Sequence, residues 1–395
     1  MVSPQIHLSK WLVLIISIIG MTSDGHARAR ILISNQVTGF NKPKGTVKTI
    51  ESHETGEVID CVDIFKQPAF DHPLLKNHTI QMKPNSNQKA NGEKYVEGAF
   101  RQVWWKYGEC PEGTVPIKRR QNLTNHHVRP LTPRLHQLNL SRNDINGVGK
   151  HEYAAVSMRG GNYNGAYAKI NVWNPTVMEN EGTFSQIWVA AGPDWDVNTV
   201  EAGWMINRER SNTNEAQIFT FWTGNGYRGS GCYDVDCEGF VHINRQFALG
   251  AVIRPVSVYG GDQYDVPIRI TRVLDTGSWW LHVANIAVAY WPPELFSYLK
   301  GPATRIDWGG EIVDMQQRGS HTSTQMGSGH FPYEGLGHAS YFSNLKFIDE
   351  GLIERDPENL LKIVHRSECY DLMLNKFGVD FYYGGPGFSP QCTNF

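Results

Sequence analysis

The sequence predicts an all-β protein, in which a small N-terminal domain precedes an antiparallel β-sandwich of two stacked, jelly-roll-like sheets. The chain has 395 residues, of which 40% are hydrophobic and 19% charged, so it can bury a large core. From about residue 151 onward, short aromatic and β-branched runs alternate with Gly, Asn, Asp and Pro. This spacing is typical of sandwiches.

The first 29 residues resemble a secretory signal peptide. Lys10 precedes an apolar run from Trp11 to Met21, and the small-residue pattern Ala27-Arg-Ala29 follows it. The run is too short to span a bilayer comfortably, and no later stretch is apolar for long enough. We therefore expect a secreted protein that has no membrane contact after signal removal.

The two parts of the remaining chain carry opposite charge. Residues 30–150 hold 18 Lys and Arg against 11 Asp and Glu, a net charge of +7, whereas residues 151–395 hold 17 against 27, a net charge of −10. The basic residues are scattered among apolar ones, which argues against a nucleic-acid-binding tail. We expect the N-terminal part to dock on the acidic part in cis, through an attraction that weakens as carboxylates are protonated.

A stretch rich in Pro, Asn and basic residues, residues 115–150, has the composition of an exposed, cleavable linker. We place the N-terminal domain and linker at residues 30–135 and the main domain at residues 148–395. The expected strands of the main domain lie within residues 151–158, 165–175, 182–192, 198–207, 217–226, 240–244, 251–260, 265–293, 304–315 and 341–349. One helix is expected around residues 356–368, with Asp356 as its cap and Pro357 in its first turn.

Six cysteines suit an oxidising compartment, and their proximity suggests the pairs Cys232–Cys237, Cys369–Cys392 and Cys61–Cys110. Asn77, Asn122 and Asn139 stand in glycosylation sequons. No CxxC or HExxH spacing occurs, so we expect no metal and no cofactor.

Several familiar motifs fit better as turns. Asp275-Thr-Gly-Ser278 resembles an aspartic-protease turn, but no second copy exists, and a hairpin explains it. Gly229-Ser-Gly231 and Gly327-Ser-Gly329 lack the spacing of a nucleophile elbow. Asp234, Asp236 and Glu238 could bind calcium, although a solvated acidic loop closed by a disulfide is the simpler interpretation.

Two glutamates differ from these. Strand alternation places Thr199, Glu201, Gly203 and Met205 on one face of residues 198–207, and Gly309, Glu311 and Val313 on one face of residues 304–315. Each glutamate thus has a glycine two residues away on its own side. Because glycine in a strand often marks a close backbone approach, Gly203 and Gly309 suggest room for a substrate backbone. Trp204 and Trp308 fall on the opposite, core side.

The residues around Glu201 and Glu311 resemble the neprosin family of plant secreted proteins. The resemblance is carried by residues 60–84 near the N-terminus and, later, by HEYAAV, FSQIWVAAG, NTVEAGWMIN, YRGSGCYDVDCEGFVHIN, WGGEI, HTSTQMGSGHFPYEG and FYYGGPG. It implies an activation peptide followed by a β-sandwich glutamic peptidase, with Glu201 and Glu311 as the catalytic pair. The implied activity is cleavage of proline-containing peptides or proteins after proline at acidic pH.

Such a pair can activate water without a metal. One carboxylate deprotonates water while the protonated partner binds the carbonyl oxygen and protonates the leaving nitrogen. From the sequence we assign Glu201 as base and Glu311 as acid. The linker could be cut by the enzyme itself at Pro130 or Pro133, or by a basic-specific protease at Lys118-Arg-Arg120. The final compartment is extracellular, in the apoplast, or vacuolar.

Two other functions fit the composition. A secreted, glycosylated, aromatic-rich sandwich could bind carbohydrate or cell wall without catalysis. A peptidase homologue could also persist as a latent zymogen or inhibitor.

Overall fold

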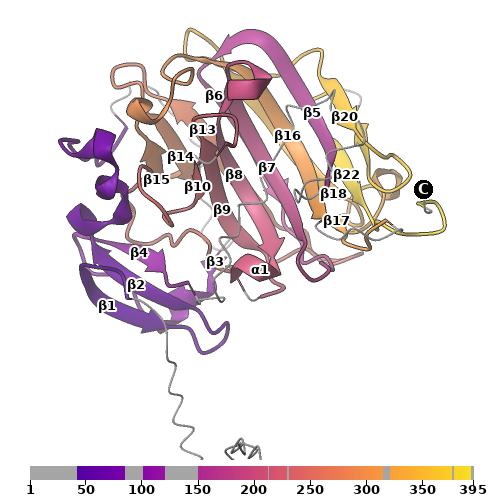
Figure 1. The fold of residues 1–395 in the computed structure, drawn as a ribbon. Helices are drawn as coiled ribbons and strands as arrows, with labels where there is room; N and C mark the ends of the chain where they lie inside the picture. Colours follow the sequence, from indigo (N-terminus) through magenta and orange to yellow (C-terminus); the bar gives the residue numbers. More distant parts are fainter. Residues whose placement is uncertain are drawn as a thin grey trace, which may run out of the picture. The chain divides into compact units, whose positions relative to one another are not determined.

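Two large antiparallel sheets stack face to face in the main domain (Figure 1). The computed structural model describes residues 42–84, 101–120, 150–211, 213–228, 231–314, 321–375 and 378–392. Within these ranges the predicted β-sandwich with an N-terminal domain is confirmed. The three expected disulfides, Cys61–Cys110, Cys232–Cys237 and Cys369–Cys392, are all present.

The first sheet has seven strands in the order β10-β9-β8-β7-β16-β5-β20. Its long central strands lie side by side in Figure 1. Their bounds are β10 (Cys232–Tyr233), β9 (Gln217–Thr223), β8 (Asn198–Asn207), β7 (Gly182–Ala191), β16 (Ala303–Asp314), β5 (Lys150–Tyr163) and β20 (Leu361–Val364). A short helix, α1 (Arg208–Ser211), follows β8.

The second sheet has ten strands, eight of them on one path. In spatial order these are β11 (Val241–His242), β15 (Ile286–Trp291), β14 (Trp279–Val283), β13 (Asp265–Arg272), β6 (Gly165–Asn171), β18 (Ser340–Ile348), β22 (Phe381–Gly385) and β17 (Met326–Gly327). Two more strands, β19 (Glu354–Arg355) and β21 (Asp371–Leu374), pair with β18 and β22. Short 3-10 turns connect the strands of the main domain at η5 (Asp194–Asp196), η6 (Pro293–Leu295) and η7 (Pro332–Glu334).

The core between the sheets follows the predicted alternation. Val200, Trp204 and Trp308 of the first sheet are fully buried and share one hydrophobic cluster with Ile170 and Ile268 of the second. Burying such side chains contributes about 1.5–3 kcal/mol each. The opposite face of the first sheet therefore carries Glu201 and Glu311.

The N-terminal region, residues 42–120, contains a three-stranded sheet of order β1-β2-β4. Its other strand, β3, pairs with β12 of the main domain. The bounds are β1 (Thr46–Glu51), β2 (Val58–Asp63), β3 (Arg101–Gln102), β4 (Thr114–Lys118) and β12 (Ile253–Arg254), with 3-10 turns at η1 (Ile64–Lys66), η2 (Pro68–Asp71), η3 (Pro73–Leu75) and η4 (Val103–Tyr107).

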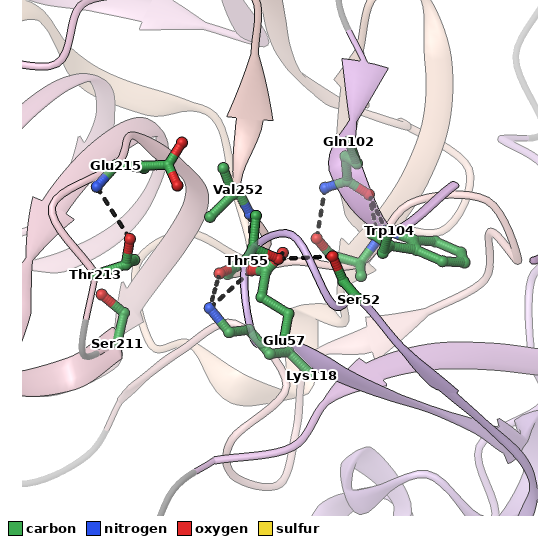
Figure 2. Close-up of polar contacts among 12 residues, drawn as sticks. Ser52, Thr55, Glu57, Gln102, Trp104, Lys118, Ser211, Thr213, Glu215 and Val252 are labelled. Atoms are coloured by element: carbon green, nitrogen blue, oxygen red, sulfur yellow. Dashed lines mark hydrogen bonds and ion pairs between the residues drawn. The ribbon is translucent and has the colours of Figure 1, made fainter. Parts of the chain in front are cut away.

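Buried hydrogen bonds join the N-terminal region to the main domain. Glu57 accepts the backbone N–H of Val252 at 2.9 Å and pairs with Lys118 at 3.0 Å, as Figure 2 shows. Gln102 both donates to the carbonyl of Ala248 at 2.7 Å and accepts from its N–H at 2.8 Å. Such paired amide contacts satisfy buried groups that would otherwise each cost about 1–3 kcal/mol.

The ion pairs between the regions do not follow the net charges. Among the described residues three pairs cross this boundary, and in two of them the acid lies on the N-terminal side: Glu54 with Arg254 and Glu109 with Arg245. Only Arg120 with Asp236 has the expected polarity. Apolar contacts of Trp104 with Ala248 and Ala251, and a backbone hydrogen bond from Val103 to Val252, also join the two regions. The net charges of the regions therefore do not describe the contacts between them.

The prediction of a helix around residues 356–368 is wrong. Leu361–Val364 forms β20, which pairs with residues 154–157 of β5 at the edge of the first sheet. Pairing with β5 satisfies the backbone N–H and C=O groups of residues 361–364, which a helix would otherwise have satisfied internally. The turn at Asp275, by contrast, does connect the antiparallel strands β13 and β14.

Several predictions fall outside the described ranges. The signal peptide at residues 1–29, the domain limits at residues 135 and 148, Pro130, Pro133 and the sequons at Asn122 and Asn139 all lie there. Asn77 is described and exposed. None of the helices in the described ranges is long and apolar enough to cross a membrane.

Candidate active site

Glu201 projects from β8 into a fully buried position. Its Oε1 accepts hydrogen bonds from the Thr199 hydroxyl at 2.6 Å and from the Tyr227 hydroxyl at 2.9 Å. Its Oε2 has no hydrogen-bond partner and is also buried. Thr199 occupies the same face because it precedes Glu201 by two residues in the strand. One oxygen of Glu201 is thus held in place, and the other remains available for chemistry.

Glu311 projects from β16 onto the same face and is also fully buried. Its Oε1 accepts from the Tyr153 hydroxyl at 3.0 Å and lies 2.6 Å from His151 Nδ1. Its Oε2 accepts from the Gln186 amide at 3.0 Å. Both oxygens of Glu311 are therefore engaged, in contrast to those of Glu201.

Strand β7 separates the two glutamates. Trp188 of β7 is directly opposite Glu201, and Phe184 is directly opposite Glu311. The offset is four residues, which corresponds to about 13 Å along an extended strand. Each carboxyl group has its own hydrogen-bond donors, and the interaction between the two is electrostatic, since the charge of Glu311 raises the pKa of Glu201.

Burial dominates the protonation of both groups. Desolvation raises the pKa of Glu201 to about 8, against the opposing hydrogen bond from Thr199. Desolvation likewise raises the pKa of Glu311 to about 8, against the hydrogen bonds from Tyr153 and Gln186. At this degree of burial, both carboxyl groups therefore hold their protons at acidic and neutral pH.

Gly203 and Gly309 do not provide the open space that their spacing suggested. Both lie directly opposite Gln186 of β7. A Cβ on Gly203 would lie 1.9 Å from the carbonyl oxygen of Ser185, and one on Gly309 would lie 2.5 Å from that of Ala154. The neighbouring strands occupy the space, so these glycines permit close strand contact within the sheet.

The acidic loop around the Cys232–Cys237 disulfide is neutralised by arginines. Arg210 pairs with both Asp234 and Asp236, and Asp236 also pairs with Arg120. Asp234 further accepts the N–H of Thr220 at 2.8 Å. The carboxylates of Asp234 and Asp236 are therefore already paired with arginines, which favours a structural role for the loop over calcium binding.

Sequence reasoning missed most of the groups around the glutamates. Tyr153, Gln186, Trp188 and Asp307 share their face of the sheet, and Tyr227 reaches it from the turn after β9. Alternation could have placed the strand residues on a face. The order of the strands, which makes them neighbours of Glu201 and Glu311, is not visible in the local sequence.

The fold and this face define a class of protein, an all-β sandwich with two buried glutamates on one sheet and a folded N-terminal region docked beside it. The chain belongs to the neprosin family, since the family model described as Neprosin matches residues 179–386 and the one described as Neprosin activation peptide matches residues 49–157. A neprosin domain joined to an activation peptide supports a peptidase made as a zymogen.

Solved structures with partial similarity include two peptidases. Scytalido-glutamic peptidase with a peptide-based transition-state analogue is 11% identical, with a TM-score of 0.35, over 60% of this chain and 99% of that one. SCP-B, a member of the eqolisin family of peptidases, is 8% identical, with a TM-score of 0.32, over 60% and 98%. A homodimeric agglutinin from chicken liver is 8% identical, with a TM-score of 0.22, over 40% and 96%. At these TM-scores we draw no function from any of the three.

Proposed function

We propose that this chain is the zymogen of a secreted glutamic endopeptidase, which cleaves after proline at acidic pH through Glu201 and Glu311. The observation that carries the proposal is the presence of two fully buried glutamates on one sheet face, each held by its own hydrogen-bond donors. Fully buried carboxyl groups are rare without a function or a charged partner, and strongly raised pKa values cluster at active sites.

The hydrogen bonds favour the opposite roles from those assigned from the sequence. Donors engage both oxygens of Glu311, and a protonated His151 would add a charged donor. Such donors favour an ionised carboxylate, whereas the charge of Glu311 favours a protonated Glu201. In this scheme Glu311 is the base and Glu201 is the acid.

The reaction then needs only water and the two carboxyl groups. Glu311 takes a proton from water as the water oxygen bonds to the scissile carbonyl carbon. Glu201 donates from its unpaired Oε2, first as a hydrogen bond to the carbonyl oxygen and then as a proton to the leaving nitrogen when the C–N bond breaks. Proton exchange with solvent restores the starting state.

Desolvation also offers a reason for latency. With both pKa values near 8, neither carboxyl group ionises readily at acidic pH, so the buried site lacks a base. Since desolvation is the largest cause of both shifts, entry of water lowers both pKa values and allows one group to ionise. We expect maturation to hydrate the site.

Aromatic side chains beside Glu201 support the proposed preference for proline. Phe221 lies directly opposite Glu201 on β9 and stacks on Tyr227, with ring centroids 6.0 Å apart. Tyr233 packs edge-on against Phe221 at 4.8 Å. A pyrrolidine ring packs well on such flat apolar surfaces, which suits proline on this side of the scissile bond.

The contacts of Lys118-Arg-Arg120 favour self-processing over cutting at this basic site. Lys118 belongs to β4 and pairs with Glu57, while Arg119 makes a bidentate contact with Asp60. A protease must bind its site as an extended strand, so this segment would first have to leave its sheet. N-terminal sequencing of acid-matured wild type and Glu201→Gln tests this, since normal maturation of the isolated variant would rule out self-cleavage.

Digestion of quenched proline-containing peptides from about pH 2 to 7 tests the activity itself. Acid-treated wild type is expected to cleave after proline, and Glu201→Gln and Glu311→Gln are expected to be inactive. Activity in either variant would contradict the glutamate mechanism. The carbohydrate-binding alternative predicts instead that both substitutions leave function intact.

A further inference from the structure

A row of three side chains crosses the sheet at Glu201. Trp188 of β7 is directly opposite Glu201, and Asp307 of β16 is directly opposite Trp188. Directly paired residues of antiparallel strands project to the same face, with Cβ atoms about 4.5–5.5 Å apart. All three side chains are fully buried.

Each member of this row has one buried polar atom without a hydrogen-bond partner. These atoms are Oε2 of Glu201, Nε1 of Trp188 and Oδ1 of Asp307. A buried polar group left unpaired costs about 1–3 kcal/mol, and more when it is charged. Three such atoms on one row provide unused hydrogen-bonding capacity beside Glu201.

Asp307 is fixed for such a role. Its Oδ2 accepts from Nε of Arg305 at 2.7 Å, and both side chains are buried. Arg305 holds the carboxylate in one orientation and balances its charge, which leaves Oδ1 as an acceptor. Asp307 makes no hydrogen bond to Glu201 or Glu311 among the described contacts, so its free oxygen is not committed to the catalytic pair.

Trp188 connects this row to the second glutamate. Its ring meets Tyr153 edge-on, with centroids 6.4 Å apart, and Tyr153 donates to Glu311. Because β16 lies between β7 and β5, the Trp188 ring extends across β16 to reach Tyr153. Trp188 therefore lies between the two carboxyl groups, where a substrate spanning both would contact it.

We propose that Trp188 and Asp307 form a clamp for the main chain of the substrate. The Trp188 indole N–H donates to a substrate carbonyl, and Asp307 Oδ1 accepts a substrate backbone N–H. A peptide main chain supplies one acceptor and one donor per residue, which matches this row. The inference rests on the proposed peptidase function, and it adds which groups hold the backbone beside the scissile bond.

The clamp makes a prediction about specificity. The substrate residue that faces Asp307 must carry an N–H, so proline or an N-methyl residue is rejected there. A site built to bind an N–H discriminates strongly against a ligand that lacks it, because its own buried group is then left unpaired. The enzyme would accept proline at the cleavage position and refuse it at this second position.

An N-methyl scan tests the clamp. Quenched peptides that carry a single backbone N-methyl group, at each position within three residues of the scissile bond, are assayed with acid-matured protein. In the wild type, one position is expected to lower kcat/KM by about tenfold or more, which corresponds to about 1.4 kcal/mol. In Asp307→Asn the amide oxygen pairs with Arg305, and the amide NH2, a donor, faces the substrate. This variant should therefore lower kcat/KM for the parent peptide and remove the penalty at that position.

Trp188→Phe tests the clamp independently, which matters if Asp307→Asn fails to fold. It keeps the ring and removes the N–H, so KM should rise several-fold while the N-methyl penalty remains. Matched controls are Trp195→Phe and Asp262→Asn, both at exposed positions.

The outcomes separate this proposal from the peptidase function. Cleavage of the parent peptide with no sensitive position, or with the same penalty in Asp307→Asn, overturns the clamp alone. An unchanged KM in Trp188→Phe overturns the role of the indole. Failure of the wild type to cleave any peptide contradicts the peptidase function and the clamp with it.

Discussion

The hydroxyl of Tyr227 donates to Oε1 of Glu201 at 2.9 Å and thereby joins the turn after β9 to the acid on β8. This hydrogen bond lowers the pKa of Glu201 against the larger opposing effect of burial. Tyr227 also stacks on Phe221, so its ring and its hydroxyl have separable roles.

Tyr227→Phe should weaken catalysis without removing the ring. The loss of one donor raises the pKa of Glu201 further, so the pH limb governed by Glu201 should move to higher pH. We expect kcat/KM to fall by about tenfold, which corresponds to about 1.4 kcal/mol. A pH series of kcat/KM measures both effects. Tyr333→Phe, at an exposed tyrosine, is the control, and an unshifted profile in Tyr227→Phe would contradict the assignment.

The buried glutamates should make the folded protein less stable as pH rises. Their folded-state pKa values are raised to about 8 from an ordinary value of 4.5. The folded protein therefore binds more protons than the unfolded chain, and the resulting stability is fully present below pH 4.5 and lost as pH rises through 8. At about 1.4 kcal/mol per pKa unit, a rise of this size corresponds to several kcal/mol for each of the two groups.

Urea unfolding of the full chain at about pH 5 and pH 8 measures this loss. In the double variant Glu201→Gln/Glu311→Gln the difference in unfolding free energy between the two pH values should shrink by several kcal/mol. An equal pH dependence in the wild type and the double variant would show that the two groups are not buried as described.

Gly203→Ala should destabilise the sheet. The new Cβ would lie 1.9 Å from the carbonyl oxygen of Ser185, and because that atom belongs to the backbone the strands must separate. Overpacking of this kind costs about 1–3 kcal/mol, occasionally more. Chemical denaturation gives the value. Gly301→Ala is the matched control, since its Cβ would approach only the carbonyl oxygen of Tyr298, at 3.8 Å.

His78 should loosen the N-terminal region as the pH falls. Its Nε2 lies 2.8 Å from the Tyr290 hydroxyl of the main domain, and burial lowers its pKa from 6.5. A lowered pKa means that the docked state binds fewer protons, so its stability is present above pH 6.5 and decreases as pH falls below that value. Protonation of a partly buried imidazole thus favours undocking.

Hydrogen–deuterium exchange of residues 68–81 between about pH 7.5 and 5 tests whether protonation of His78 loosens the N-terminal region. After correction for intrinsic exchange rates, protection should fall in the wild type and change less in His78→Gln. His53→Gln at an exposed histidine is the control. An identical loss of protection in His78→Gln would assign the effect to other groups.

The sequence predicted the two faces of β8 and β16 correctly, because alternation alone decides which residues of a two-layer sandwich face its core. Val200 and Trp204 are buried in the core, and Glu201 is on the other face. The space beside Gly203 was not predictable, since it depends on the approach of β7. Which strand pairs with which is set by contacts between residues far apart in the chain.

The predictions drawn from net charge and from the helix cap at Asp356 also depended on contacts that the local sequence does not reveal. The net charges of the two regions are sums over all residues, whereas docking depends on the few that meet, such as Glu54 and Arg254. The cap at Asp356 is a local signal, and the open edge of β5 outweighed it. In both cases a tertiary contact decided the outcome.

The pairing of cysteines has a consequence for activation. All six cysteines are used in three disulfides, and Cys61–Cys110 lies wholly within the N-terminal region while the other two lie wholly within the main domain. A cut between residues 120 and 150 would therefore leave two chains with no covalent bond between them. Their association would change from an intramolecular to a bimolecular equilibrium, so dilution alone would help separate them.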